Sequence, residues 1–345
     1  MDSSIFLFLV QDGVINGAIY ALVAVAIVLV FAVTRILFIP QGEFVAFGAL
    51  TLTAFEAGQV PGIAGLLPAL GAVAAALELW RRRSDLDVRQ VGRILGSDVV
   101  LPCALAGLAL VLAPMQLGAA VSIVMTLALV IPLGPLVYRI AFRPLAEASV
   151  LVLFITAVGV HLVLVALGLL FFGPEGYRAT PVSDAAFEAG PMLISGQSIA
   201  VVVVAAALFL ALYVFFDRTL TGKALKASAV NRRGALLVGI PTALSGRIAF
   251  ALAAAIGALS GILVAPITTI YYDTGFIIGL KGFVAAILGG LGSYPATATA
   301  AILVGLVESF SSFWASAFKE VIVFTIILPV LFWRSLAAPH AEDEE

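Results

Sequence analysis

Long apolar runs are the feature that most constrains this chain. Each run is close to the roughly 20 residues that a helix needs to cross the hydrocarbon layer of a membrane. Membrane-spanning strands would instead alternate apolar and polar residues over about ten positions. The sequence therefore predicts an all-α integral membrane protein, a polytopic bundle of about 9–11 transmembrane helices in a single domain, residues 1–345. The runs are 14–33, 36–57, 60–80, 98–114, 118–138, 150–172, 197–216, 246–267, 276–291, 295–316 and 320–334.

Composition agrees, since only 11% of the residues are charged whereas a soluble domain carries roughly a quarter. Basic residues are concentrated in cytoplasmic loops of membrane proteins. With the N-terminus outside and the runs alternating in direction, all the Lys and Arg fall inside except Arg178, Lys281 and Lys319. We therefore expect an outer N-terminus and a cytoplasmic C-terminus, with an acidic disordered tail at residues 338–345.

The segment 217–247 is the most basic of the expected inner loops. It has one acidic residue, Asp217, against six basic ones: Arg218, Lys223, Lys226, Arg232, Arg233 and Arg247. One interpretation is an ordinary loop of the positive-inside kind. The other is a docking surface for a cytoplasmic partner.

Capping residues favour short helices within this segment. Asn231 is a suitable N-cap, Gly239 can adopt the left-handed conformation that ends a helix, and Pro241 prevents continuation. We expect one helix over residues 232–238, and another over 220–230 with Gly222 breaking its first turn.

Ionisable and polar residues inside the runs are candidates for a translocation pathway, because burying them in a membrane is costly. Glu43 follows Pro40 and Gly42, about two turns inside the second run, and is either a pathway residue or the partner of a nearby cation. Asn16 and Tyr20 share a helix face; they face Glu43 or, as we favour, form a bond between helices. Glu308 should face the bundle.

For three other features inside or between the runs, we favour a structural role over a functional one. His161 lies alone in mid-span, and a hydrogen-bonded core histidine is favoured over a proton relay. Lys281 is expected to extend toward the outer surface, with no further role. Gly289, Gly290, Gly292 and Pro295 predict a tight inner turn, either a helix-packing turn, which we favour, or the hinge of a gate.

No catalytic or nucleotide-binding motif is present, and one cysteine with two histidines does not suggest a metal site. We expect no enzyme activity, cofactor, metal or nucleic-acid partner.

Three groups of segments carry a resemblance to a known family. They are Asn16–Leu22 with Gln41-Gly42-Glu43, then Arg143-Pro144-Leu145 with Thr221–Ala224 and Gly239-Ile240, and finally Ala285–Pro295 with Gly305–Glu308. In this order they resemble permease subunits of branched-chain amino acid ABC importers. Two departures stand out: the family usually has His where Gln41 stands, and residues 58–117 look like an inserted extra pair of helices.

The resemblance implies a bacterial or archaeal inner-membrane importer for branched-chain or related small amino acids. It implies a second permease subunit, identical or different, two ATP-binding subunits and an extracytoplasmic solute-binding protein. It places a coupling helix on Lys223–Gly239. The coupling residues would be Gly222, Lys223, Ala224, Lys226, Arg232, Arg233 and Gly239, and the pathway residues Asn16, Tyr20, Gln41, Glu43 and Glu308.

The alternative is a self-sufficient secondary transporter or channel in which Glu43, Glu308 and His161 are linked to ion movement. An intramembrane enzyme is disfavoured because no pair of nucleophile and base is visible.

The predicted orientation can be tested by cysteine labelling in a Cys103→Ser background. Because basic loops stay inside, Arg233→Cys should react with a membrane-impermeant maleimide only after the cells are permeabilised. Glu188→Cys, in the expected outer segment, should react in intact cells. Labelling of position 233 in intact cells would contradict the topology.

Overall fold

The computed structural model describes residues 3–83, 87–183, 185–189 and 192–337, so the expected acidic tail lies outside the described residues. Within this part of the chain, eight helices are long and apolar enough to span a membrane. Two of them are composite: α4, η1, α5 and η2 run on as residues 88–115, and α6, α7, η3 and η4 as residues 119–145. The others are α1 (Ser3–Thr34), α3 (Ile63–Arg81), α8 (Val150–Phe172), α9 (Gly196–Arg218), α12 (Thr242–Val264) and α14 (Tyr294–Trp314).

The components of the composite helices are α4 (Val88–Leu95), η1 (Gly96–Val100), α5 (Leu101–Leu112), η2 (Ala113–Met115), α6 (Ala119–Val130), α7 (Leu133–Val137), η3 (Tyr138–Phe142) and η4 (Arg143–Leu145). Shorter helices occupy the remaining predicted runs: α2 (Gln41–Glu56), α13 (Thr274–Leu288), α15 (Lys319–Thr325) and α16 (Ile327–Ala337), with η5 (Ser316–Phe318) before α15. The all-α polytopic fold is therefore confirmed.

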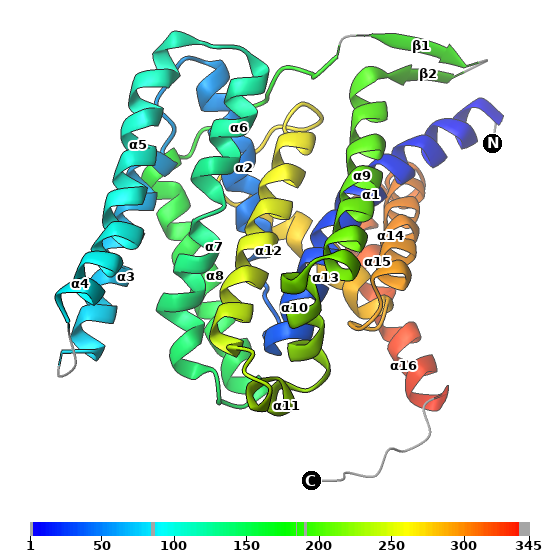
Figure 1. The fold of residues 1–345 in the computed structure, drawn as a ribbon. Coiled ribbons are helices and arrows are strands. Elements are labelled where there is room, and N and C mark those ends of the chain that lie inside the picture. Colours follow the sequence, from blue (N-terminus) through cyan, green and yellow to red (C-terminus); the bar gives the residue numbers. More distant parts are fainter. Residues whose placement is uncertain (1–2, 84–86, 184, 190–191, 338–345) are drawn as a thin grey trace.

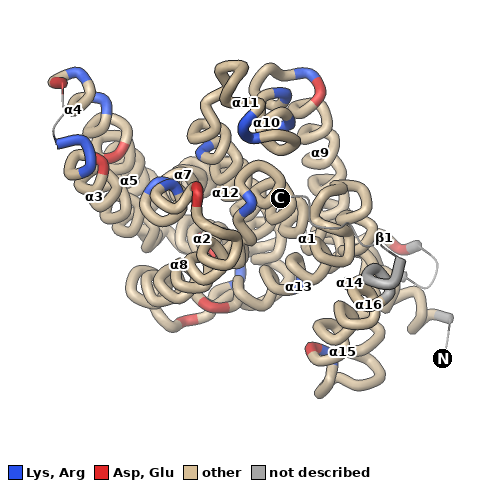
Figure 2. The backbone as a smooth tube through the Cα atoms, turned by 90° about the horizontal axis from the view of Figure 1, so that it is seen from below, with Lys and Arg blue, Asp and Glu red and all other residues tan. Residues whose placement is uncertain are grey.

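The two ends of the bundle differ in character (Figure 1). One end carries the only described strands, an antiparallel hairpin of β1 (Ala186–Ala189) and β2 (Met192–Ser195). The other carries α10 (Leu220–Val230), α11 (Arg232–Leu237) and α4. Figure 2, a view from this second end, shows Lys and Arg around α3, α4, α7, α10 and α11. We call these the hairpin end and the basic end.

Helix α1 lies at the centre of the bundle. It packs against α12, α13 and α14, and its residues from Ala18 to Val30 are all buried. A helix that is apolar on every side is expected in such a position. Next to it, the rings of Phe38, Phe44, Phe142 and Phe250 form one cluster, with the Phe38 and Phe250 centroids 4.8 Å apart.

Small residues set the spacing between the central helices. A Cβ atom added to Gly42 of α2 would overlap the carbonyl oxygen of Gly275 in α13, and one added to Gly275 would overlap that of Gly42. At Gly17 of α1, an added Cβ would lie 2.7 Å from the Cα of Ile302 in α14. Close backbone approach at small residues is the usual packing mode in membranes, where lipid is as apolar as the side chains.

The second predicted run is shorter than expected because the helix begins only at Gln41. Arg35 has a positive φ of 61°, which ends α1, and Pro40 lacks the N–H needed to continue a helix. Glu43 therefore lies in the first turn of α2, with no helical turns of the second run before it.

The predicted inserted segment 58–117 forms two neighbouring helices at one edge of the bundle, α3 and the composite helix 88–115 (Figure 1). The polar residues before the second apolar run are thus helical too, as α4 and η1.

The contact of α2 with α13 predicts a specific sensitivity to side-chain size. Gly42→Ala forces the two backbones apart, and such overpacking costs about 1–3 kcal/mol. The variant should show a lower midpoint of thermal unfolding in detergent than the unmodified protein. Gly159→Ala in α8 is the matched control, because nothing lies within 4 Å of the added Cβ, and it should melt as the unmodified protein does. Equal midpoints for the two variants would contradict this packing.

Candidate functional site

Two short capped helices form a compact unit at the basic end, which we call the α10–α11 unit (residues 219–240). The side chain of Thr219 accepts a hydrogen bond from the Gly222 N–H at the start of α10, and that of Asn231 accepts one from the Gly234 N–H at the start of α11, both at 2.9 Å. Gly239 has φ +85° and ends α11, and the Ile240 N–H donates to the Ala235 carbonyl. This is a Schellman ending, so the predicted caps are confirmed.

The expectation that Gly222 breaks the first turn was wrong. Gly222 is helical and buried, and an added Cβ would overlap the Phe215 carbonyl at the end of α9. Glycine is needed there because α10 folds back closely on α9.

Polar contacts attach the α10–α11 unit to the bundle. Arg232 donates to the Ala146 carbonyl before α8 at 2.8 Å, and the Ser228 hydroxyl lies 3.1 Å from that of Ser245 in α12. The first contact joins the unit to the connection between the composite helix 119–145 and α8, and the second joins it to α12. A force applied to α10 or α11 would therefore reach this connection and α12.

The outer surface of the unit combines basic and apolar side chains. Lys223, Lys226 and Arg233 are exposed, and Lys226 pairs with Asp217 at 3.2 Å in solvent. Leu220 and Leu237 are 87% and 88% exposed, and Val230 and Val238 are also largely exposed. Exposed apolar side chains beside basic ones commonly mark an interaction surface.

The predicted glycine turn joins α13 to α14. Gly290 and Leu291 both have positive φ, and the Leu291 N–H donates to the Ala286 carbonyl at 3.0 Å. The Tyr294 ring stacks on Phe216 at the end of α9, with centroids 5.6 Å apart. The turn therefore lies beside the α9–α10 junction, and an added Cβ at Gly289 would lie 2.5 Å from the Thr297 Cα. This geometry is that of a tight packing turn, with Gly292 and Pro295 in and just after it.

Lys281 is the centre of a buried charge network, and the expectation that it extends outward without a role was wrong. Its side chain is 6% exposed, and its Nζ lies 2.6 Å from Glu308 and 3.1 Å from Glu320. Tyr20 donates a hydrogen bond of 2.5 Å to the other oxygen of Glu308. A buried lysine needs such partners because the desolvated charge is otherwise very costly. The network joins α1, α13, α14 and α15.

The same network shows whether the polar residues of α1 contact Glu43 or another helix. Tyr20 bonds to Glu308 in another helix rather than to Glu43, as favoured. Among the described residues, the one side-chain hydrogen bond of Asn16 is local, a 3.3 Å bond to Asp12 on its own helix. Of the five predicted pathway residues, Tyr20 and Glu308 thus meet directly, whereas Asn16 stands apart.

Glu43 has a partner that the sequence did not reveal. Its Oε1 lies 2.6 Å from Nδ1 of His161 in α8, so His161 is not alone in mid-span. The imidazole also stacks on Phe276 at 4.2 Å between centroids. The neighbouring Gln41 donates to the Ala253 carbonyl of α12 at 2.9 Å. These contacts fix both side chains of α2 against two other helices.

A pocket of about 670 Å³ lies at the hairpin end, between the start of α1, the start of α9 and the segment near residue 180. Asp12 and Arg178 line it together with apolar side chains such as Phe8 and Ile267. A carboxylate and a guanidinium beside apolar groups could pair with the two charges of an amino-acid zwitterion. Sequence reasoning did not identify this pocket, because its walls come from four separate segments.

The Lys281 network predicts a large effect of removing its cation. Lys281→Met leaves Glu308 buried without its counter-charge, which should cost about 3–5 kcal/mol of stability. The double variant Lys281→Met/Glu308→Gln should recover part of this loss. Lys226→Met removes an exposed ion pair and should cost at most about 1 kcal/mol. Thermal unfolding in detergent measures all three, and equal effects of Lys281→Met and Lys226→Met would contradict the buried network.

Comparison with known proteins identifies the family. A family model described as the branched-chain amino acid transport system permease component matches residues 95–331. The chain is 28% identical over 266 residues to the high-affinity branched-chain amino acid transport system permease protein BraD of Pseudomonas aeruginosa, covering 74% of this chain and 85% of BraD. It is 28% identical over 200 residues to LivH of Escherichia coli strain K12, covering 56% of this chain and 65% of LivH. No solved structure matches the chain significantly. Because the family model matches well over half of the sequence, this chain belongs to the family of branched-chain amino acid transport system permease components.

Proposed function

We propose that this protein is the membrane-spanning subunit of an ATP-binding cassette importer for branched-chain or related small amino acids. It forms the translocation pathway, and separate subunits hydrolyse ATP. The observation that carries the proposal is the α10–α11 unit, which is capped at both helix starts, bonded to Ala146 before α8 and to Ser245 of α12, and covered with exposed basic and apolar side chains.

An ordinary inner loop does not need these features. Positive charge alone is sufficient to orient a membrane protein, whereas Leu220, Leu237 and Val238 expose apolar surface that water does not favour. A partner protein that binds here covers the apolar surface and removes the unfavourable free energy of its contact with water. We assign this docking role to Gly222, Lys223, Ala224, Lys226, Arg232, Arg233 and Gly239, together with these apolar neighbours.

The proposed mechanism converts partner closure into helix movement. Closure of two ATP-binding subunits would shift the α10–α11 unit, and the Ser228–Ser245 contact would pass this shift to α12. Gln41 binds the Ala253 carbonyl of the same helix, so α12 connects the unit to the start of α2. The amino acid is moved only if its affinity differs between the outward-open and inward-open states.

We place the outer entrance of the pathway at the pocket that contains Asp12 and Arg178, with Asn16, Tyr20, Gln41, Glu43 and Glu308 further along. A solute-binding protein would deliver the amino acid to this end, and a second permease subunit, identical or different, would complete the pathway. Such an assembly belongs in the inner membrane of a bacterial or archaeal cell. The relatives that carry printed branched-chain amino acid names support the choice of substrate.

The coupling role is tested with the complex that co-purifies with this chain, reconstituted in liposomes with its solute-binding protein. Leu237→Asp should lower ATP-driven leucine uptake about tenfold or more, because a central apolar contact contributes about 2 kcal/mol or more to an interface. Gly239→Trp should also lower it, because a side chain is strained at φ +85° and its bulk would obstruct the partner. Val88→Asp is the matched control: Val88 is 85% exposed at the same end but outside the α10–α11 unit. It should leave uptake unchanged.

Two results would contradict the proposal. One is unchanged uptake in both α10–α11 variants. The other is leucine uptake by the lone chain driven by a proton or sodium gradient, which would instead indicate a secondary transporter that uses the Glu43–His161 pair.

A further inference from the structure

A basic pocket lies beside the α10–α11 unit, outside the proposed translocation pathway. Its volume is about 390 Å³, within the range of about 300 to 1,000 Å³ that ligand pockets occupy. It is formed by the end of α3, by α4 and η1, by the end of the composite helix 119–145, and by the start of α12. Five arginines line it: Arg82, Arg93, Arg139, Arg143 and Arg247.

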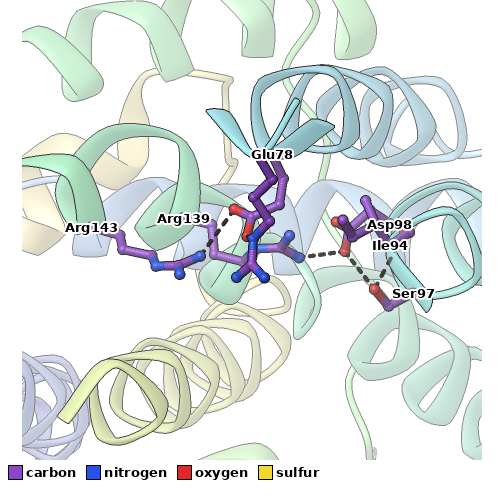
Figure 3. Close-up of polar contacts among 7 residues, drawn as sticks. Glu78, Ile94, Ser97, Asp98, Arg139 and Arg143 are labelled. Carbon is purple, nitrogen blue, oxygen red and sulfur yellow. Dashed lines mark hydrogen bonds and ion pairs between the residues drawn. The ribbon is translucent and has the colours of Figure 1, made fainter. Parts of the chain in front are cut away.

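Two carboxylates hold three of these arginines in place (Figure 3). Glu78 lies 2.7 Å from Arg82 and 3.0 Å from Arg143. Asp98 pairs with Arg139, whose side chain is 9% exposed, and also accepts a 2.9 Å bond from Ser97. The Glu78–Arg143 and Asp98–Arg139 pairs join the segment 58–117 to the composite helix 119–145, whereas the Glu78–Arg82 pair lies within α3.

The pocket retains an excess of positive charge. The side chains of Arg93 and Arg247 have no hydrogen bond or ion pair to any residue that the structure describes, yet both line the pocket. Five guanidinium groups face only two carboxylates here. An anionic ligand would neutralise the excess, and guanidinium groups bind phosphate oxygens particularly well because of their planar, forked geometry.

The surroundings of the pocket favour a lipid as the source of that phosphate. The composite helix 88–115 is mostly uncovered by protein, and exposes Leu95, Val100 and Leu101 beside the pocket. An apolar groove of about 430 Å³ runs between α3, η3 and α8 and is lined by residues such as Leu70 and Ile140. Ile140 lies one helical turn before Arg143, so a polar site and an apolar site occur on the same two helices.

We propose that the basic pocket binds the phosphodiester headgroup of an anionic phospholipid, with an acyl chain of that lipid in the apolar groove. Basic pockets between membrane helices are suited to anionic lipid headgroups. The lipid would link the segment 58–117 to the start of α12. Pro241, Ala243 and Leu244, which follow the end of α11, also line the pocket. Lipid binding would therefore stabilise the helix to which the α10–α11 unit is attached.

The experiment uses the full chain, purified in neutral detergent with any co-purifying subunits. Binding of dioleoyl phosphatidylglycerol and of dioleoyl phosphatidylcholine is titrated by native mass spectrometry, and inorganic phosphate is tested in parallel by thermal unfolding. We expect phosphatidylglycerol to bind at least about tenfold more tightly than phosphatidylcholine, and to raise the unfolding midpoint. Inorganic phosphate at the same concentration should not raise it.

Variants locate the site. Arg93→Gln/Arg247→Gln should weaken phosphatidylglycerol binding about thirtyfold, because each arginine near an anionic lipid contributes about 1 kcal/mol. Arg93→Lys/Arg247→Lys keeps the charge and should retain most of the binding. Arg83→Gln/Arg89→Gln is the matched control: both residues are exposed in the same region but do not line the pocket, and binding should be unchanged.

Three outcomes would overturn the proposal. Equal affinity for the two lipids would exclude recognition of the anionic headgroup. Unchanged phosphatidylglycerol binding in Arg93→Gln/Arg247→Gln would exclude this pocket. An equal rise of the unfolding midpoint with inorganic phosphate would indicate a soluble anion site rather than a lipid site. None of these measurements depends on transport, so failure here and failure of the proposed function are distinguishable.

Discussion

A charge surrounded by hydrocarbon must find a partner, and this constraint ties the helices of the bundle together. Lys281 lies between Glu308 and Glu320, Glu43 lies against His161, and Arg139 pairs with Asp98. Each pair joins two different helices, and the Glu43–His161 pair joins residues 118 positions apart in the sequence. Removing one member of a buried pair costs more than the pair itself contributes, because the remaining charge stays desolvated. The ion pairs therefore specify which helices are neighbours, more than they add net stability.

Close contact between backbones makes these pairs geometrically possible. Gly42 and Gly275 bring α2 and α13 together, and the next residue of α2, Glu43, contacts His161 of α8. Gly17 and Gly305 do the same for α1 and α14, which places the Tyr20 hydroxyl within 2.5 Å of Glu308. A larger residue at any of these positions would separate the helices and lengthen the polar contacts. Small residues and buried charges are thus parts of one packing arrangement.

Helix α12 is the structural link between the two ends of the molecule. At its start it contacts the α10–α11 unit through Ser245 and borders the basic pocket through Arg247. Further along, its Ala253 carbonyl accepts the bond from Gln41, and Gly261 allows close contact with α2. In the proposed importer, the same helix would receive the movement of the ATP-binding subunits and carry it to the residues of the pathway. A lipid bound at its start would act on that movement directly.

Local signals in the sequence were sufficient for the helical membrane fold, for the bounds of α10 and α11, and for the caps at Asn231 and Gly239, because apolar length, charge and capping act within a few residues. The family resemblance also rested on such short segments. The partners of Glu43, Lys281 and Asp98 could not be predicted, since each lies on a helix whose position depends on packing across the whole bundle. For the same reason the sequence predicts neither the partner of His161 nor the inward position of Lys281. The sequence by itself determined that the chain is a helical membrane protein and which residues are costly to bury; only the tertiary structure decided how those costs are met, because the contacts that meet them join different helices.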